Sequence, residues 1–217
     1  MDPYVYPGTD VLKNLRDIRD DKRLRVFEAD ASARRLVELQ ALPPSGAFDA
    51  RHLREIHRHI FQDVYHWAGE VRTVNISRAG QFPYAFPNRI EAALNSTFTA
   101  LRNEKSLASL NPAQFAAKAA HYPGEINAVH PFREGNGRTQ REFIRQLAQR
   151  SGHGVQWDRV SRDMMYEASH RSFQRGDNSG LEAVMRAAVR PQQQRALEAR
   201  DAINRRGARD PDRGRDR

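Results

Sequence analysis

HPFREGNGRTQR, residues 130–141, combines a histidine, a carboxylate, a Gly-Asn-Gly turn and two arginines. Gly135 and Gly137 can adopt positive φ at little steric cost, so successive backbone N–H groups can turn inward around an anion. The residues that follow, TQREFIRQLAQRSG, read as an amphipathic helix, so the positive end of the helix dipole faces the turn. The stretch therefore predicts a phosphate-binding turn at the start of a helix.

The side chains of this stretch suit a polyphosphate. Arg138 and Arg141 are three residues apart in the first turn of the predicted helix, so both guanidinium groups can reach the same phosphates. Glu134 offers a hard oxygen ligand for Mg²⁺, although a carboxylate at a helix start is also favoured by the dipole alone. His130 is the only candidate general base within the stretch, and Asn136 can donate an amide N–H to a phosphate. Each residue type is common in structural roles, and their ordered combination favours phosphate chemistry.

The stretch resembles the signature of the Fic family, HPF-x-(D/E)-G-N-G-R-x-x-R, and has every fixed residue of it. The resemblance extends to GEINAVHPF, to VYHWAGEVRTVNIS and to the opening DPYVYPGTDVLKNLRDIRD. It implies a mainly α fold, a Fic-type helical bundle with a short β-hairpin flap at about residues 71–86, over residues 1–189. It also implies site residues: catalytic His130, nucleotide-binding Gly135, Asn136, Gly137, Arg138 and Arg141, and Glu134 for the metal.

The resemblance implies an activity as well. Most proteins with this signature transfer AMP from ATP to a protein hydroxyl, so we expect a protein adenylyltransferase that uses ATP and Mg²⁺. Relatives with Lys in place of the second Gly bind the nucleotide reversed and transfer phosphate instead, whereas this chain has Gly137 there. Two alternatives stay open: a transferase that uses another nucleotide, and a non-catalytic nucleotide-binding adaptor.

The opening residues resemble Fic proteins of the toxin type, which implies a toxin whose targets are the B-type subunits of gyrase or topoisomerase IV. Fic proteins are commonly inhibited by a helix with the pattern (S/T)-x-x-x-E-(G/N), whose Glu pairs with the second arginine of the signature, here Arg141. No Ser or Thr of this chain has a Glu four residues later, and the nearest approach is Ser45 with Asp49. We therefore expect inhibition in trans by a separate small antitoxin.

Length and composition limit the other possibilities. A chain of 217 residues with 39% hydrophobic residues suits one domain. The absence of cysteine excludes disulfides, thiolate zinc sites and cysteine nucleophiles. The N-terminal MDPYVYPG lacks the features of a signal peptide, and no apolar run is long enough to span a membrane. We expect a cytoplasmic protein, and export into another cell by a specialised machine stays open.

The net charge of +9 is concentrated near the C-terminus. From Arg186 to Arg217 there are ten arginines against five carboxylates, which is about half of the net charge. Residues 190–217 therefore read as a basic, disordered tail. The remaining domain is only weakly basic and has no nucleic-acid-binding motif, so we expect no specific nucleic acid as a partner.

Hydrophobic periodicity predicts a helical chain with one exception. Residues 70–86 carry β-branched side chains around Arg78-Ala79-Gly80, which predicts a hairpin. Ile76, Phe82 and Tyr84 on this hairpin could hold a target protein by strand addition, and packing onto the domain is an equal alternative. Besides the helix after the turn, helices are expected over residues 9–20, 21–42, 48–64, 88–103, 111–129 with a kink at Pro123, 160–174 and 180–189.

Overall fold

The computed structural model describes residues 2–41, 46–77 and 82–191. These residues form eight α-helices, two short 3₁₀-helices and one two-stranded sheet. The α-helices are α1 (Asp21–Ala41), α2 (Ala50–Phe61), α3 (Pro87–Asn103), α4 (Pro112–Ala119), α5 (His121–Val129), α6 (Asn136–Arg150), α7 (Arg162–Arg175) and α8 (Ser179–Ala188). The 3₁₀-helices are η1 (Lys105–Leu107) and η2 (Trp157–Arg159), and the antiparallel sheet pairs β1 (His153–Val155) with β2 (Val189–Pro191).

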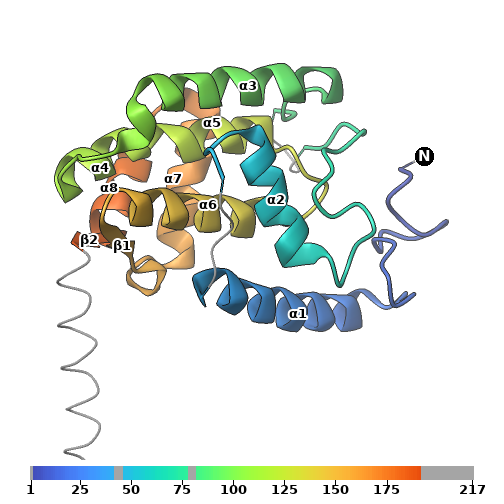
Figure 1. Cartoon of the computed structure of the whole chain (residues 1–217). Coiled ribbons are helices and arrows are strands. Elements are labelled where there is room, and N and C mark those ends of the chain that lie inside the picture. The colour runs from blue at the N-terminus through green and yellow to red at the C-terminus, as the bar shows by residue number, and fades with distance from the viewer. Residues whose placement is uncertain (1, 42–45, 78–81, 192–217) are drawn as a thin grey trace, which may run out of the picture.

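Helix α6, which begins inside the 130–141 stretch, lies in the middle of the bundle (Figure 1). Helix α1 lies along one side of it and α3 along the other, while α2 and α5 contact it directly. Phe143, Ile144 and Leu147 of α6 are at most 1% exposed, so the core is built around this helix. The site at its N-terminus is therefore held from several sides.

The ends of the helices follow from local sequence. Asp49 caps α2 by accepting a hydrogen bond from the His52 N–H at 2.8 Å, and Ser161 caps α7 in the same way. Asn111 and Gln114 form a reciprocal capping box at the start of α4. These side chains satisfy N–H groups that a helix leaves unpaired in its first turn.

The helix predicted over residues 9–20 is wrong. The side chain of Asn14 accepts from the backbone N–H groups of Arg16 and Ile18 and donates to the carbonyls of Leu12 and Ile18. These bonds replace the i to i−4 pattern that a helix needs, and Asp17 has φ of 50°. The segment folds instead as turns around an isolated bridge between Val5 and Leu12.

The helix predicted over residues 111–129 is two helices, α4 and α5, that meet at Ala120. Pro123 lies in the first turn of α5, where a backbone N–H has no partner within the helix and its loss costs little. At the kink predicted at Pro123 the structure has a new helix start, shortly before the proline.

The predicted flap is a chain reversal rather than a regular hairpin in its described residues. One antiparallel bridge joins Ser77 to Pro83, and residues 78–81, which include the predicted turn, lie outside the described residues. The regular sheet lies elsewhere: β1 follows α6, and β2 follows α8 and pairs with β1. Arg190 belongs to β2, and the predicted tail from 192 onward also lies outside the described residues. Within the described ranges, none of the helices combines the length and the apolar character that a membrane span requires.

Candidate functional site

The loop between α5 and α6 has two residues in the left-handed region. His130 ends α5 with φ of 47°, and Gly135 precedes α6 with φ of 81°. A Cβ atom at Gly135 would lie 2.2 Å from Cε2 of Phe61, so this position excludes a side chain for both conformational and steric reasons. Gly137 has much more room, since a Cβ there would meet only the end of the Arg141 side chain at 3.4 Å.

Asn136 holds this loop closed. Its Oδ1 accepts from the Phe132 N–H at 2.9 Å, and its Nδ2 donates to the Phe132 carbonyl at 2.7 Å. The side chain is thus engaged on both sides and the residue is only 3% exposed. Any contact of Asn136 with a phosphate would come from its backbone N–H, in the first turn of α6.

A buried histidine of α2 supports the loop from below. His57 Nδ1 accepts from the Gly69 N–H at 2.8 Å, and its Nε2 lies 3.1 Å from the carbonyl of Glu134, to which it donates. Its ring stacks on Phe132 with the ring centroids 3.8 Å apart. Burial lowers the pKa of His57 to about 3, so this imidazole is neutral at physiological pH and acts as a fixed support.

His130 is placed through its backbone and its ring. Its N–H donates to the Ile126 carbonyl at 2.9 Å, and its own carbonyl accepts from Nε of Arg72 at 2.8 Å. The imidazole stacks on the ring of Tyr84 with centroids 3.9 Å apart. The flap and α5 together therefore fix the candidate base.

Arg72 is a buried cation whose described partners are all carbonyl oxygens. It is 1% exposed and donates to His130, to Val74 and Ala85 of the flap, and to Val129 at the end of α5. A cation at the C-terminal end of α5 also interacts favourably with the negative end of that helix dipole. Burial lowers the pKa of Arg72, although arginine stays protonated across the range in which proteins function.

The two arginines of the signature have different surroundings. Arg138 forms an ion pair with Glu28 of α1, donates to Ser32 Oγ at 2.9 Å and lies 4.7 Å above the ring of Phe61. Arg141 has no carboxylate partner among the described residues. Burial first, and then the neighbouring Arg138 and Arg162, lower its pKa. Of the two signature arginines, Arg141 is therefore the one whose positive charge is not balanced by a carboxylate and is available to an incoming anion.

Glu134 lies at the edge of the same loop. Its Oε1 accepts from the Gly135 N–H at 2.7 Å and lies 3.5 Å from Arg138, and the side chain is 45% exposed. No three His, Asp or Glu side chains gather into a metal cage in the described part of the chain. One accessible carboxylate fits Mg²⁺, which usually takes one or two carboxylates and completes its shell with phosphate oxygens and water.

These groups face a cavity of about 560 Å³ between α6 and α7. This volume lies within the usual range of small-molecule sites. One wall carries His130, Gly137, Arg138 and Arg141, and the opposite side is largely apolar. The apolar lining residues are Pro123, Ile144, Trp157, Val160, Met165, Tyr166, Leu181, Val184 and Met185.

Comparison with known proteins decides the family. The profile of the Fic/DOC family matches residues 47–148. The chain is 39% identical over 192 residues to the probable protein adenylyltransferase y4lH of Sinorhizobium fredii, covering 87% of this chain and 96% of that protein. This chain belongs to the Fic/DOC family. It is also 42% identical over 185 residues to the protein adenylyltransferase VbhT of Bartonella schoenbuchensis, covering 85% of this chain but only 38% of VbhT.

The fold of this Fic/DOC chain agrees with that of solved structures. The crystal structure of BepC from Bartonella tribocorum, with bound AMPPNP, matches with a TM-score of 0.82 and 28% identity. The match covers 87% of this chain and 97% of that one. The mainly helical Fic fold predicted from the sequence is thereby confirmed.

The flap residues of the Fic domain differ in exposure. Phe82 is 67% exposed, whereas Tyr84 is 6% exposed and packs between His130 and Phe173. Ile76 is half-buried, and its carbonyl accepts from the Tyr84 N–H at 3.2 Å. Tyr84 thus packs onto the domain, which was the alternative interpretation, whereas the side chain of Phe82 is exposed.

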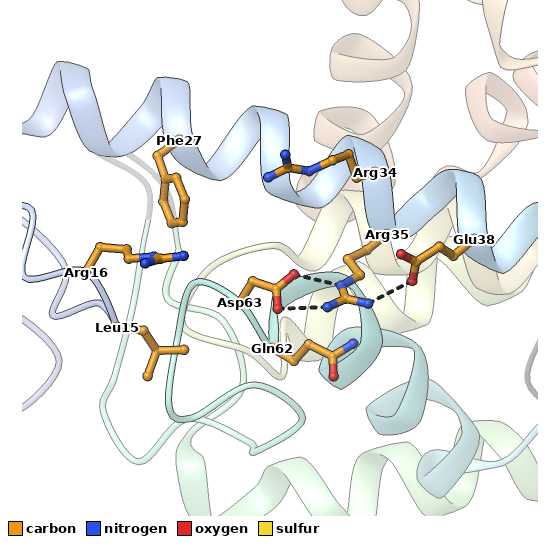
Figure 2. Close-up of a pocket in the computed structure, with 8 residues that line it drawn as sticks. All are labelled: Leu15, Arg16, Phe27, Arg34, Arg35, Glu38, Gln62 and Asp63. Carbon is orange, nitrogen blue, oxygen red and sulfur yellow. Dashed lines mark hydrogen bonds and ion pairs between the residues drawn. The ribbon is translucent and has the colours of Figure 1, made fainter.

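A second basic cavity of the Fic domain, about 430 Å³, lies between α1 and the segment after α2. Figure 2 shows Arg35 at its wall, bonded to both carboxylate oxygens of Asp63 and to Glu38. These two carboxylates neutralise Arg35, so it joins α1 to the end of α2 rather than marking an anion site.

Sequence reasoning missed three residues that support the Fic site: Glu28, His57 and Arg72. Glu28 lies on the face of α1 that also carries the buried Leu24 and Ala31, and a charge on an apolar stripe is a signal of a buried partner. His57 stands likewise among the apolar positions of α2. The β-like run VRTVNIS gave no such signal for Arg72, because three of its four acceptors are carbonyls distant in sequence, at Ala85, Val129 and His130.

Proposed function

We propose that this Fic/DOC chain transfers AMP from ATP to a Tyr, Ser or Thr hydroxyl of a target protein. The enzyme class is protein adenylyltransferase, which is also that of the relatives it resembles over most of its length. The observation that carries the proposal is the cavity, onto which His130, the start of α6 and the uncompensated Arg141 all open.

In the proposed reaction the phosphates of ATP lie over residues 135–138 and meet the N–H groups of the first turn of α6. The imidazole of His130 takes the proton of the target hydroxyl, whose oxygen forms a bond to the α-phosphorus. The bond from the α-phosphorus to the β-bridging oxygen breaks, and pyrophosphate leaves with its charge balanced by Arg138 and Arg141. Positioning and charge neutralisation supply the catalysis, as in other phosphoryl chemistry.

Glu134 would hold Mg²⁺, since its carboxylate is accessible beside the phosphate loop. The ion would neutralise phosphate charge when bound. Within this chain, the Gly135 N–H fixes one oxygen of Glu134 and leaves the other for a ligand.

The sharpest test uses ATP labelled at either the α- or the γ-phosphate, incubated with the chain and bacterial proteins. We expect transfer of the α-label only, and mass spectrometry should find AMP on a hydroxyl residue. Transfer of the γ-label would identify a kinase instead, and nucleotide binding without any transfer would identify the adaptor. Repeating the assay with the other nucleoside triphosphates tests the preference for ATP.

His130→Ala isolates the base. We expect transfer to fall by at least about a hundredfold, because general-base catalysis contributes roughly 10²–10⁴-fold. Affinity for the nucleotide should stay within about threefold, since the base acts on the target hydroxyl. His121→Ala, at an exposed histidine outside the cavity, is the matched control. Transfer by His130→Ala above a tenth of wild type removes His130 as the base.

We further propose that the chain is the toxin of a toxin–antitoxin pair, acting in the cytoplasm on a gyrase or topoisomerase IV B-type subunit. The support is that Arg141 lacks a carboxylate partner among the described residues, as expected if an inhibitory Glu comes from another protein. Asp49, the nearest approach to an inhibitory pattern, caps α2 instead.

This proposal predicts growth inhibition when the chain is expressed alone, and relief by the product of a small adjacent gene. The variant that decides between inhibition in trans and in cis is Glu28→Gly, because Glu28 is the α1 carboxylate that pairs with a signature arginine. If the purified wild-type chain is inert and Glu28→Gly restores label transfer, the inhibitor lies within the chain and the antitoxin proposal fails.

A further inference from the structure

A third arginine lines the nucleotide cavity, and neither the signature nor the proposed mechanism uses it. Arg162 is the first residue of α7 and lines the same cavity as Arg141, which belongs to α6. The positive charge of Arg162 is close enough to Arg141 to contribute to the lowered pKa of Arg141. No ion pair of Arg162 occurs among the described residues, and its side chain is exposed.

The charges around the cavity are unbalanced. Its lining includes Arg138, Arg141 and Arg162, and no Asp or Glu is among the described residues that line it. Glu28 compensates only Arg138. Two guanidinium groups thus remain without a carboxylate at one end of the cavity, and repulsion between them would be relieved by an anion.

The order of the groups along α6 indicates which part of a nucleotide would meet this pair. Gly137 lies in the first turn of α6, at the end of the helix next to the proposed base His130. Arg141 follows about 6 Å further along the helix axis. A polyphosphate that starts at Gly137 and runs along α6 therefore brings its last phosphate to Arg141. Arg162 and the N-terminal end of α7, which Ser161 caps, face that place from the opposite wall.

We propose that Arg162 binds the terminal phosphate of a nucleoside triphosphate, together with Arg141, and thereby selects triphosphates over diphosphates. This inference rests on the proposed function, because it takes the nucleotide to lie with its α-phosphate next to His130. It adds a binding residue from α7 to the site. The two walls of the cavity then hold the pyrophosphate portion from both sides.

Calorimetry with the full chain in Mg²⁺ buffer tests the inference, using AMPPNP, ADP and AMP as ligands. For Arg162→Gln we expect the Kd of AMPPNP to rise about tenfold, which matches the loss of one charge-assisted contact. The Kd values of ADP and AMP should change less than twofold. Arg162→Lys should retain most of the AMPPNP affinity. The matched control is Arg171→Gln, on the same helix but outside the cavity and paired with Asp177.

The outcomes separate the two proposals. If Arg162→Gln weakens the binding of ADP and of AMPPNP equally, or weakens the binding of neither, the proposed role of Arg162 is overturned. A wild-type chain that binds none of the three nucleotides overturns the proposed function itself. Thermal melting without nucleotide checks that the variants fold. If Arg162→Gln does not fold, Arg162→Ala takes its place, provided that it melts like the wild-type chain. A loss of its preference for AMPPNP over ADP would then support the role of Arg162, and an unchanged preference would overturn it.

Discussion

Gly135 and Gly137 stand two residues apart in the signature, yet their surroundings differ. Gly135 has positive φ and is backed by the ring of Phe61, while Gly137 is helical and open on the cavity side. Backbone conformation therefore requires glycine at the first position. At the second position a Cβ would fit, and under the proposed function glycine there leaves room for the nucleotide.

Matched alanine substitutions test this distinction. Gly135→Ala should destabilise the fold by about 2–5 kcal/mol, from left-handed strain and the clash with Phe61. Gly137→Ala should melt within a few degrees of wild type and lose nucleotide affinity instead. Denaturant unfolding and calorimetry measure the two effects. Similar stability losses for both variants would contradict this account.

His57 makes stability depend on pH. Its folded-state pKa of about 3 lies below the ordinary value, so between these values the unfolded chain binds a proton that the folded chain excludes. The free energy of unfolding should therefore decrease as the pH is lowered, by about 2 kcal/mol from pH 7 to pH 5.

His57→Gln should remove this part of the slope, whatever it costs at neutral pH. His121→Gln, at an exposed histidine, should keep the wild-type slope. Urea unfolding at the two pH values measures both. An unchanged slope in His57→Gln would mean that His57 is already protonated in the folded chain at pH 5.

At the scale of elements, the flap and α5 are joined through Arg72. Its donors reach Val74 and Ala85 on the two arms of the flap, and His130 at the end of α5. Lys cannot offer this planar set of donors, so a change that keeps the charge removes the geometry.

Arg72→Lys should lower the free energy of unfolding by about 3 kcal/mol, because buried carbonyls lose their donors. Amide exchange should rise in peptides covering residues 71–77 and 82–86. Arg89→Lys, at an exposed arginine near the same segment, should change neither. Unaltered exchange in Arg72→Lys would show that other contacts hold the flap.

The elements also show where sequence reasoning reached its limit. The helices that bury one stripe, α2, α3 and α6 among them, were predictable from periodicity, and the signature loop was predictable from its residue types. The helix expected over residues 9–20 was not formed, because Asn14 competes for backbone groups in a way that a periodic pattern does not record. The contrast between Arg138 and Arg141 depends on Glu28, which is over a hundred residues away in the chain.

At the scale of the whole molecule, the last strand of the described chain pairs with an earlier one and belongs to the folded domain. β2 pairs with β1, so that Pro191 lies opposite His153 and Val189 opposite Val155. Residues assigned to the tail by composition thus contribute to the domain as far as Pro191. Beyond it the sequence offers arginines without apolar periodicity.

Truncation after Pro191 should leave label transfer and melting temperature close to those of the full chain. Truncation after Ala188 removes β2 and exposes the buried Val155, so it should lower the melting temperature by several degrees. A folded Pro191 truncation with greatly reduced transfer to a purified target would assign substrate recruitment to the tail.

Arg72 has one more consequence, which concerns the order in which the chain assembles. Its acceptors come from residues 74, 85, 129 and 130, so its guanidinium loses water at full cost unless the chain through His130 has already come together. A folding intermediate with the flap packed but α5 unformed would bury a cation that lacks two of its acceptors, the carbonyls of Val129 and His130. The flap and His130, the proposed base, should therefore become ordered in a single cooperative step, and a partly folded chain has neither.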